Sequence, residues 1–233
     1  MSLRSFAARA MVRLLRPALE TALDQDSQNL GRALRRRALE DTADFVASHM
    51  ASVRSFASAP ALLQHAMSQI PAGSRGLVCE FGVFRGDSIR LIAEALAGQA
   101  VYGFDSFEGL PEDWLDGFPR GTFRLDRLPE VPGNVTLIQG WYSETLAPFL
   151  EDHPGHASFL HVDCDLYSSA KTVLELFEPR LDRGTVIVFD EYFNYAGWRE
   201  GEFKAFAELV HRSRIPFEYI GYTRSQQAAV RIL

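Results

Sequence analysis

The fold is decided by the stretch Val78-Cys79-Glu80-Phe81-Gly82-Val83-Phe84-Arg85-Gly86. An apolar run from Leu77 to Phe81 ends in glycines, and a segment with hydrophobic residues at helical spacing follows it. This order predicts a strand, a tight turn and a helix. Glycines in such a turn let the backbone approach a ligand closely, and the unpaired N–H groups that open the helix favour an electron-rich group.

The turn also carries a charge at the end of its strand. Glu80 begins the pattern acidic-x-Gly-x-x-x-Gly, whereas a dinucleotide-binding turn reads G-x-G-x-x-G. A carboxylate here repels a pyrophosphate and attracts a ligand that carries an ammonium group. A second apolar run, 100–105, ends in Asp105 about 20 residues after the turn, where an acid accepts hydrogen bonds from ribose hydroxyls in doubly wound nucleotide sites.

Together these two motifs resemble the S-adenosylmethionine site of the class I methyltransferases. The resemblance implies S-adenosylmethionine as cofactor, with its amino acid part near Glu80 and Gly82 and its ribose on Asp105. Gly140 and Trp141, which follow a third apolar run, are expected to flank the adenine. The candidate cofactor-binding residues are Glu80, Gly82, Arg85, Gly86, Asp105, Ser106, Gly140, Trp141 and Asp163.

Size and composition fit one sizeable core. The chain has 233 residues, of which 47% are hydrophobic, and no apolar run approaches the ~20 residues that span a bilayer. Its two cysteines, Cys79 and Cys164, are too isolated for a disulfide framework or a metal knuckle and are expected to be free thiols, which indicates the cytoplasm. A net charge of -6 argues against nucleic acid as the main partner.

Residues 1–70 are predicted to form a helical extension, and residues 71–233 a methyltransferase domain. The expected helices run to about Leu23, from Leu30 to about Met50, and from Pro60 to Ile70. Proline suits a first helical turn, and Ser58 can cap the third helix from just outside.

The first 19 residues differ in composition from the rest. They contain four arginines and no acid, with apolar residues near helical spacing. Such a segment can be an organelle transit peptide or a helix on an anionic membrane, but we favour a basic helix that packs on the domain or on a second subunit. The N-terminal helices are therefore candidate elements of a homodimer. The later cluster Arg35-Arg36-Arg37 is expected to be a solvated helix face.

From Leu77 onward, short apolar runs alternate with helical patterns, which is typical of an α/β fold. The seven expected strands are Leu77–Phe81, Val101–Asp105, Val135–Gln139, Phe159–Asp163, Val186–Asp190, Phe217–Tyr222 and Ala228–Leu233. The turn between the last two is too short for a crossover helix, so they should pair antiparallel at one end of the sheet. The prediction is a seven-stranded, mostly parallel, doubly wound sheet with a C-terminal antiparallel hairpin, which resembles the class I methyltransferase fold.

Two aromatic segments are longer than a connection requires. Residues 106–132 and 192–198 both follow predicted strand ends, at the edge where open α/β sheets bind ligands. Long loops at this edge are often lids or pocket walls. The alternative is that the rings only fix the loops.

Four carboxylates follow the fourth and fifth predicted strands. Asp163 and Asp165 follow one, and Asp190 and Glu191 follow the other. If these strands are neighbours, the four acids meet at one edge and raise one another's pKa unless a cation lies among them. Mg²⁺ or another divalent cation with oxygen ligands suits such a group. The alternative is that two of the four point to solvent or cap the following helices.

At these residues the sequence resembles the macrocin O-methyltransferase family, the metal-dependent sugar O-methyltransferases of natural-product pathways. The similar runs are 80–86, 105–111, 163–167 and 190–192. The resemblance implies that Asp163, Asp190 and Glu191 hold the metal and that Asp165 is the catalytic base. The family usually has Asp-Asp-Tyr where this chain has Asp190-Glu191-Tyr192, and the longer glutamate side chain alters the expected coordination.

The predicted function is Mg²⁺-dependent transfer of a methyl group from S-adenosylmethionine to a hydroxyl of a small molecule, a sugar or a glycosylated natural product. One alternative is a metal-independent methyltransferase acting on a phenol or a small acid. Another is a non-catalytic protein that binds a nucleotide or a partner. A dehydrogenase is disfavoured because the G-x-G-x-x-G turn is missing. His161, alone on its strand, is interpreted as a core residue rather than a base.

Overall fold

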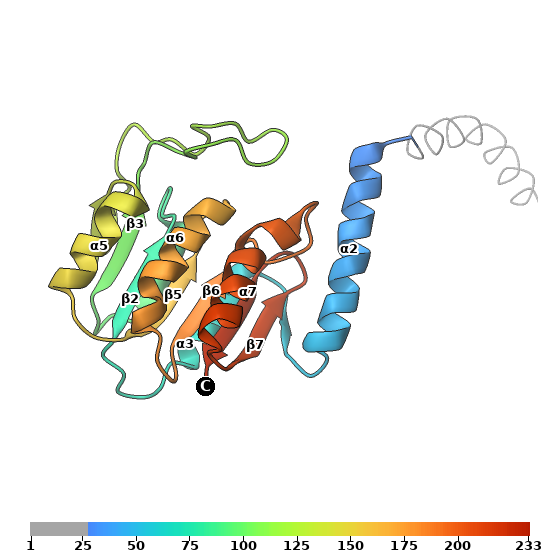
Figure 1. Ribbon diagram of the computed structural model, residues 1–233. Helices are drawn as coiled ribbons and strands as arrows, with labels where there is room; N and C mark the ends of the chain where they lie inside the picture. The colour runs from blue at the N-terminus through green and yellow to red at the C-terminus, as the bar shows by residue number, and fades with distance from the viewer. Residues whose placement is uncertain (1–27) are drawn as a thin grey trace, which may run out of the picture.

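The computed structural model describes residues 28–233 and contains one eight-stranded sheet (Figure 1). The strand order is β1-β7-β8-β6-β5-β2-β3-β4. The strands are β1 (Ser55–Phe56), β2 (Leu77–Phe81), β3 (Val101–Asp105), β4 (Val135–Gln139), β5 (Ala157–Val162), β6 (Val186–Phe189), β7 (Phe217–Thr223) and β8 (Ala228–Ile232). The first expected helix lies outside the described residues.

The predicted mixed topology is confirmed, with one addition. Strands β2 to β6 pair in parallel, and β8 lies antiparallel between β6 and β7. The additional strand β1 pairs in parallel with β7, through Ser55 opposite Tyr222 and Phe56 opposite Thr223. The C-terminal hairpin is therefore covered on its outer side by a strand from the N-terminal part of the chain.

Helices cover both faces of the sheet, which explains why every residue of β5 is buried. On one face lie α5 (Tyr142–Asp152), α6 (Tyr167–Phe177) and α7 (Glu202–Ser213), which share one hydrophobic core (Figure 1). On the other face α3 (Ala59–Ser68) and α4 (Asp87–Ala95) share a second core. Two short 3-10 turns, η1 (Glu178–Arg180) and η2 (Trp198–Glu200), complete the described elements.

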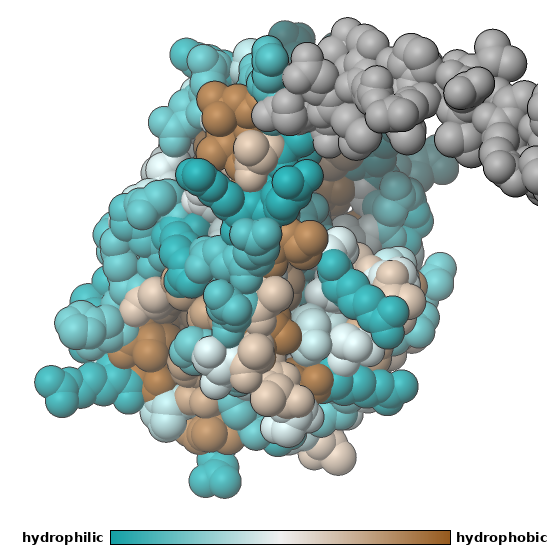
Figure 2. Space-filling model, turned by 90° about the vertical axis from the view of Figure 1, so that its right-hand side faces the viewer, coloured by the Kyte–Doolittle hydropathy of each residue, from teal (hydrophilic) through white to brown (hydrophobic). Residues whose placement is uncertain are grey.

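Helix α2 (Leu30–His49) stands at the end of the sheet beyond β7 (Figure 1). Asn29 caps it by accepting a hydrogen bond from the backbone N–H of Arg32 at 3.0 Å. Leu30, Leu34 and Leu39 are exposed, and hydrophobic residues lie among hydrophilic ones on this side of the molecule (Figure 2). The predicted solvated cluster 35–37 is exposed along the helix. The homodimer through the N-terminal helices stays a prediction.

The C-terminal half of α2 is anchored by an aromatic residue. The ring of Phe45 contacts Trp198 and Phe203 edge-on, at centroid distances of 5.5 and 5.3 Å. Thr42 accepts a hydrogen bond from the backbone N–H of Asn194 at 3.0 Å. The segment 192–198 thus binds α2, and its aromatic rings lie in the core. The alternative that these rings only fix the loop is the better description, because none of them lines the cavity described below.

Helix α3 has Pro60 in its first turn, as expected, but ends at Ser68 rather than at Ile70. Ser58 occupies the N-cap position without a side-chain cap hydrogen bond. Both α3 and β1 lie on the sheet, and the predicted domain division at residue 70 stays a prediction. No helix among residues 28–233 combines the length and apolar character that crossing a bilayer requires.

Candidate active site

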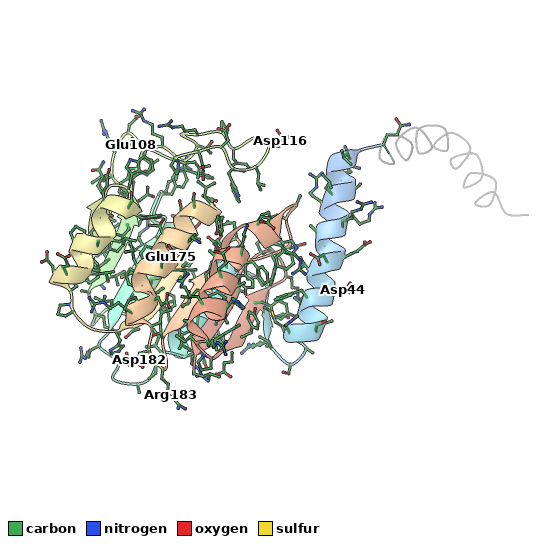
Figure 3. All side chains as sticks on the ribbon, viewed as in Figure 1. Asp44, Glu108, Asp116, Glu175, Asp182 and Arg183 are labelled. Atoms are coloured by element: carbon green, nitrogen blue, oxygen red, sulfur yellow. The ribbon has the colours of Figure 1, made fainter. Side chains whose placement is uncertain are left out.

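A cavity of about 280 Å³ opens where the parallel strands end. Residues at the ends of five neighbouring strands line it: Gly82 after β2, Asp105 and Ser106 at β3, Gly140 and Trp141 after β4, Asp163, Cys164 and Asp165 after β5, and Glu191 after β6. The loop 106–132 passes over this edge, as the positions of Glu108 and Asp116 show (Figure 3). This is the edge at which open α/β sheets bind ligands.

The loop 106–132 supplies much of the remaining wall. Gly109, Leu110, Pro111 and Phe123 line the cavity, so the prediction of a pocket wall is confirmed for this loop. Tyr142 and Ser169 also line it, although nothing in the sequence pattern distinguished them.

The turn after β2 requires glycine at position 82, because the backbone that follows β5 lies directly beside it. Gly82 has a φ of +97°, and a side chain there would collide with the carbonyl oxygen of Asp163. The two strands are also joined beside it by the N–H of Asp163, which donates to Phe81 at 2.9 Å. The close approach that this glycine permits is therefore made to β5. Gly86, with a φ of +80°, is the N-cap residue of α4.

Asp105 holds the glycine turn in place. One of its carboxylate oxygens accepts hydrogen bonds from the backbone N–H groups of Val83, at 3.0 Å, and Phe84, at 2.8 Å. The other accepts from Phe107 at 2.7 Å. Asp105 thus binds two N–H groups of the turn itself, ahead of α4, which begins at Asp87. Asp105 also lines the cavity, and its role toward a ribose stays a prediction.

Glu80 is fully buried and does not line the cavity. Its Oε1 lies 2.8 Å from Nδ1 of His161, its partner across β2 and β5, while Nε2 of His161 lies 3.9 Å from Asp190. Burial alone lowers the pKa of His161, but the proximity of Asp190 and the hydrogen bond to Glu80 outweigh it and raise this pKa well above its ordinary value. His161 is a core residue, as expected, and lies between the carboxylates of Glu80 and Asp190.

The predicted neighbours β5 and β6 are adjacent, and their acids form two overlapping groups. Asp163, Asp165 and Glu191 each place an oxygen within 4.8 Å of the others. His161, Asp163 and Asp190 form the second group at the same spacing. Asp163 is common to both groups. The four acids therefore meet at one edge as predicted, with Asp165 beside Asp163 and Glu191.

The electrostatics of this cluster follow from burial and like charge. Burial, and then the charge of Asp190, raise the pKa of Asp163 well above its usual range and that of Asp165 to about 7. Burial followed by the charge of Asp163 raises the pKa of Glu191. Burial alone would raise the pKa of Asp190, but its attraction to His161 and the hydrogen bond that it accepts from Gln227 reverse this and lower it. Oε2 of Glu191 is buried without a hydrogen-bond partner.

A divalent cation fits this donor set. The three acids that line the cavity after β5 and β6, Asp163, Asp165 and Glu191, offer carboxylate oxygens, which Mg²⁺ and similar ions prefer, and a cation would relieve their mutual repulsion. Which of these acids ligate a metal stays a prediction.

Glu202 belongs to the same region and was missed by the sequence analysis. It is the first residue of α7 and is fully buried. Its two oxygens accept hydrogen bonds from the backbone N–H groups of Cys164 and Glu191, both at 3.1 Å. Burial raises the pKa of Glu202 to about 8 although these hydrogen bonds oppose the shift. Its only sequence signal is an acid in a first helical turn, which is also common in helices without a site.

The predicted residues are thus placed unequally around the cavity. Gly82, Asp105, Ser106, Gly140, Trp141, Asp163, Asp165 and Glu191 line it, whereas Glu80, Arg85, Gly86 and Asp190 do not. The guanidinium of Arg85 lies over the ring of Phe84 at 5.0 Å. Cys79 and Cys164 are both free and buried, as expected.

Comparison with known proteins places this geometry in context. A family model described as a methyltransferase domain matches residues 79–192. A relative from Streptomyces olivaceus, named 8-demethyl-8-(2,3-dimethoxy-alpha-L-rhamnosyl)-tetracenomycin-C 4'-O-methyltransferase, is 31% identical over 56% of this chain. The match spans 58% of that relative's length.

Solved structures share the fold. The calicheamicin methyltransferase CalS11 is 23% identical with a TM-score of 0.60, covering 74% of this chain and 77% of that one. The O-methyltransferase NovP is 21% identical with a TM-score of 0.56, covering 74% and 78%. Residues 79–192 thus match a methyltransferase domain model, in agreement with the resemblance of the motifs in this segment to the class I methyltransferases.

Proposed function

We propose that this protein transfers a methyl group from S-adenosylmethionine to a hydroxyl of a small molecule, a sugar or a glycosylated natural product. One observation carries the proposal: a methyltransferase domain in which a single cavity adjoins both the expected cofactor residues and a group of buried carboxylates. The S. olivaceus relative is named for 4'-O-methylation of a rhamnosylated tetracenomycin, which supports a sugar hydroxyl as acceptor.

The cofactor is assigned to the cavity wall formed by β2, β3 and β4. Asp105 and Ser106 would bind the ribose, and Gly140 with Trp141 would flank the adenine. A carboxylate has about four acceptor positions, of which Asp105 uses three for the backbone, so one is left for a hydroxyl. The amino acid part would lie near Gly82, and Glu80 would act on it only through the charge balance of the buried pair with His161.

The metal is assigned to the carboxylates after β5 and β6. Asp163, Asp190 and Glu191 would hold Mg²⁺ or another divalent cation, as the family resemblance implies. When bound, such an ion favours the ionised form of the acceptor hydroxyl and orients it. Asp165, whose pKa is raised to about 7, suits a base that takes the hydroxyl proton near neutral pH.

The acceptor would enter beneath the loop 106–132. Leu110, Pro111 and Phe123 offer it apolar and aromatic surface, on which the flat face of a sugar or ring system can pack. Holding the acceptor oxygen in line with the methyl group would supply much of the rate enhancement.

The first test is calorimetric titration of S-adenosylmethionine into the full chain, with and without Mg²⁺. Binding in either condition supports the cofactor assignment, and its absence in both overturns the methyltransferase proposal. Methyl transfer to a rhamnoside panel is then followed by mass spectrometry. Transfer that stops in EDTA and returns with Mg²⁺ supports the metal-dependent reaction, whereas transfer that survives EDTA favours the metal-independent alternative.

A further inference from the structure

Glu202 connects three elements at the acidic cluster. The residue belongs to α7, yet its hydrogen bonds reach the turns that follow β5 and β6. Each N–H that it binds is adjacent to acids of the cluster: Cys164 lies between Asp163 and Asp165, and Glu191 follows Asp190.

The position of these two N–H groups explains why an extra acceptor is needed. The sheet fixes the residue before each of them, because Asp163 donates its N–H to Phe81 and Asp190 donates its N–H to Val162, both at 2.9 Å. The sheet pairing ends there. Glu202 then accepts a hydrogen bond from the next N–H in each turn, that of Cys164 and that of Glu191. The backbone of both acid-bearing turns is thus fixed for one residue beyond the sheet.

Only a carboxylate does this with a single side chain. Two backbone N–H donors require two acceptor atoms, and the two oxygens of the glutamate side chain supply them. A glutamine side chain has the same shape but only one acceptor oxygen. Its NH₂ group would face the second backbone N–H, so that two donors would meet without an acceptor. Burying a further carboxylate beside four acids is costly, and the location of Glu202 at the N-terminus of α7 offsets only part of this cost. The two hydrogen bonds to backbone N–H groups, made from this buried position, point to a positioning role.

We propose that Glu202 is the positioning residue of the metal site: it fixes the turns that carry Asp165 and Glu191, and thereby sets the affinity for a divalent cation, without binding that cation. The proposal rests on the proposed metal-dependent function. Partners that orient metal ligands typically contribute 10–100-fold to metal affinity. Replacing Glu202 by glutamine is therefore expected to weaken Mg²⁺ binding by about tenfold or more.

The test is calorimetric titration of Mg²⁺ into wild-type protein, Glu202→Gln and the control Glu200→Gln. Glu200 lies two residues away, is exposed, and pairs with Lys204, so its variant makes the same carboxyl-to-amide replacement outside the cluster. S-adenosylmethionine affinity is measured on the same samples, since general unfolding would lower it and a positioning effect at the metal site would not. The expected result is weaker Mg²⁺ binding in Glu202→Gln alone, with cofactor affinity within twofold of wild type.

Hydrogen exchange gives a second readout that needs no metal. The amides of Cys164 and Glu191 should exchange at least tenfold faster in Glu202→Gln than in the wild type. If that variant does not fold, Glu202→Asp serves instead, because its carboxylate is one methylene shorter and cannot reach both amides. Equal Mg²⁺ affinity in the wild type and the Glu202 variant would overturn this proposal alone. Absence of Mg²⁺ binding by the wild type would overturn the proposed metal dependence, and this proposal with it.

Discussion

Glu80 and His161 form a charge pair inside the sheet rather than at the cavity. Both side chains are almost fully buried, and they face each other across β2 and β5. Breaking a buried pair by removing one partner leaves the other charge uncompensated, which is strongly destabilising. Replacing Glu80 is therefore expected to change the stability of the fold rather than to remove a direct ligand contact.

Replacing Glu80 by alanine should lower the free energy of unfolding by about 3–5 kcal/mol, because His161 would keep a buried charge with one partner lost. Urea denaturation measures this. Glu94→Ala, which removes an exposed acid on α4, is the matched control and should change stability by less than about 0.5 kcal/mol. Equal stability of Glu80→Ala and wild type would contradict the charge pair.

Trp141→Ala should weaken S-adenosylmethionine binding about tenfold, since stacking of an aromatic side chain on a base contributes about 1–3 kcal/mol. Calorimetry provides the measurement. Trp114→Ala removes another partly exposed indole, one that packs on Phe118 and Tyr195 and does not line the cavity. It should leave the affinity unchanged, and a similar loss in both variants would argue against the adenine assignment.

At this scale, residues that end a strand were predictable and their partners were not. Asp105 and Asp163 end apolar runs and Asp165 follows two residues after the second run, so the sequence locates them at the sheet edge. The sequence does not show that Asp105 accepts three backbone hydrogen bonds from nearby N–H groups. Nor does it show that Glu202 in α7 accepts hydrogen bonds from N–H groups 11 and 38 residues away. Those contacts depend on which strands and helices are neighbours in space.

Among the elements, α2 depends on a single aromatic anchor. The ring of Phe45 contacts four aromatic rings from η2, α7, β7 and the segment after β6, while the first half of the helix is exposed apart from Ala38. Most of the stability of a surface helix comes from such packing rather than from intrinsic propensity.

Phe45→Ala should therefore cost about 3–5 kcal/mol, the range observed when a buried phenylalanine is truncated. Thermal or chemical denaturation tests this. Leu34→Ala removes an exposed apolar side chain from the same helix and should change stability by less than about 0.5 kcal/mol. If the Leu34 variant were the less stable of the two, the anchor would lie in the exposed half of α2 instead.

Elements that are apolar along their length were easy to predict. The bounds of β2, β3 and β4 agree with the expected ranges, because apolar runs between turns identify buried strands. Strand β1 was missed since two residues give no periodic signal, and they become a strand only because β7 offers an unpaired edge. For the aromatic segment 192–198 the sequence left open a lid, a pocket wall or a loop fixed by its rings, because sequence alone does not show that this segment packs against α2.

For the molecule as a whole, stability in EDTA should fall as the pH rises from about 5 to 8. Asp165 and Glu202 have folded pKa values of about 7 and 8, above their ordinary values of 3.8 and 4.5, so the folded protein binds more protons than the unfolded chain in this window. The raised pKa of His161 acts in the same direction. Each pKa unit corresponds to about 1.4 kcal/mol, so the expected decline is on the order of a few kcal/mol.

Urea denaturation at several pH values checks this expectation. Adding Mg²⁺ should restore stability most at pH 8, where the cluster carries the most negative charge, and least at pH 5. Stability that stays constant or rises with pH in EDTA would show that these carboxylates are not held in the buried cluster.

The pairing of β1 with β7 also dictates when the chain can finish folding during its synthesis. Ser55 and Phe56 are made early, but their partners Tyr222 and Thr223 lie near the C-terminus. The ring of Phe45 likewise waits for Tyr219. A ribosome that has translated most of this protein therefore carries early segments whose native neighbours do not yet exist. These contacts can therefore close only after β7 has been synthesised.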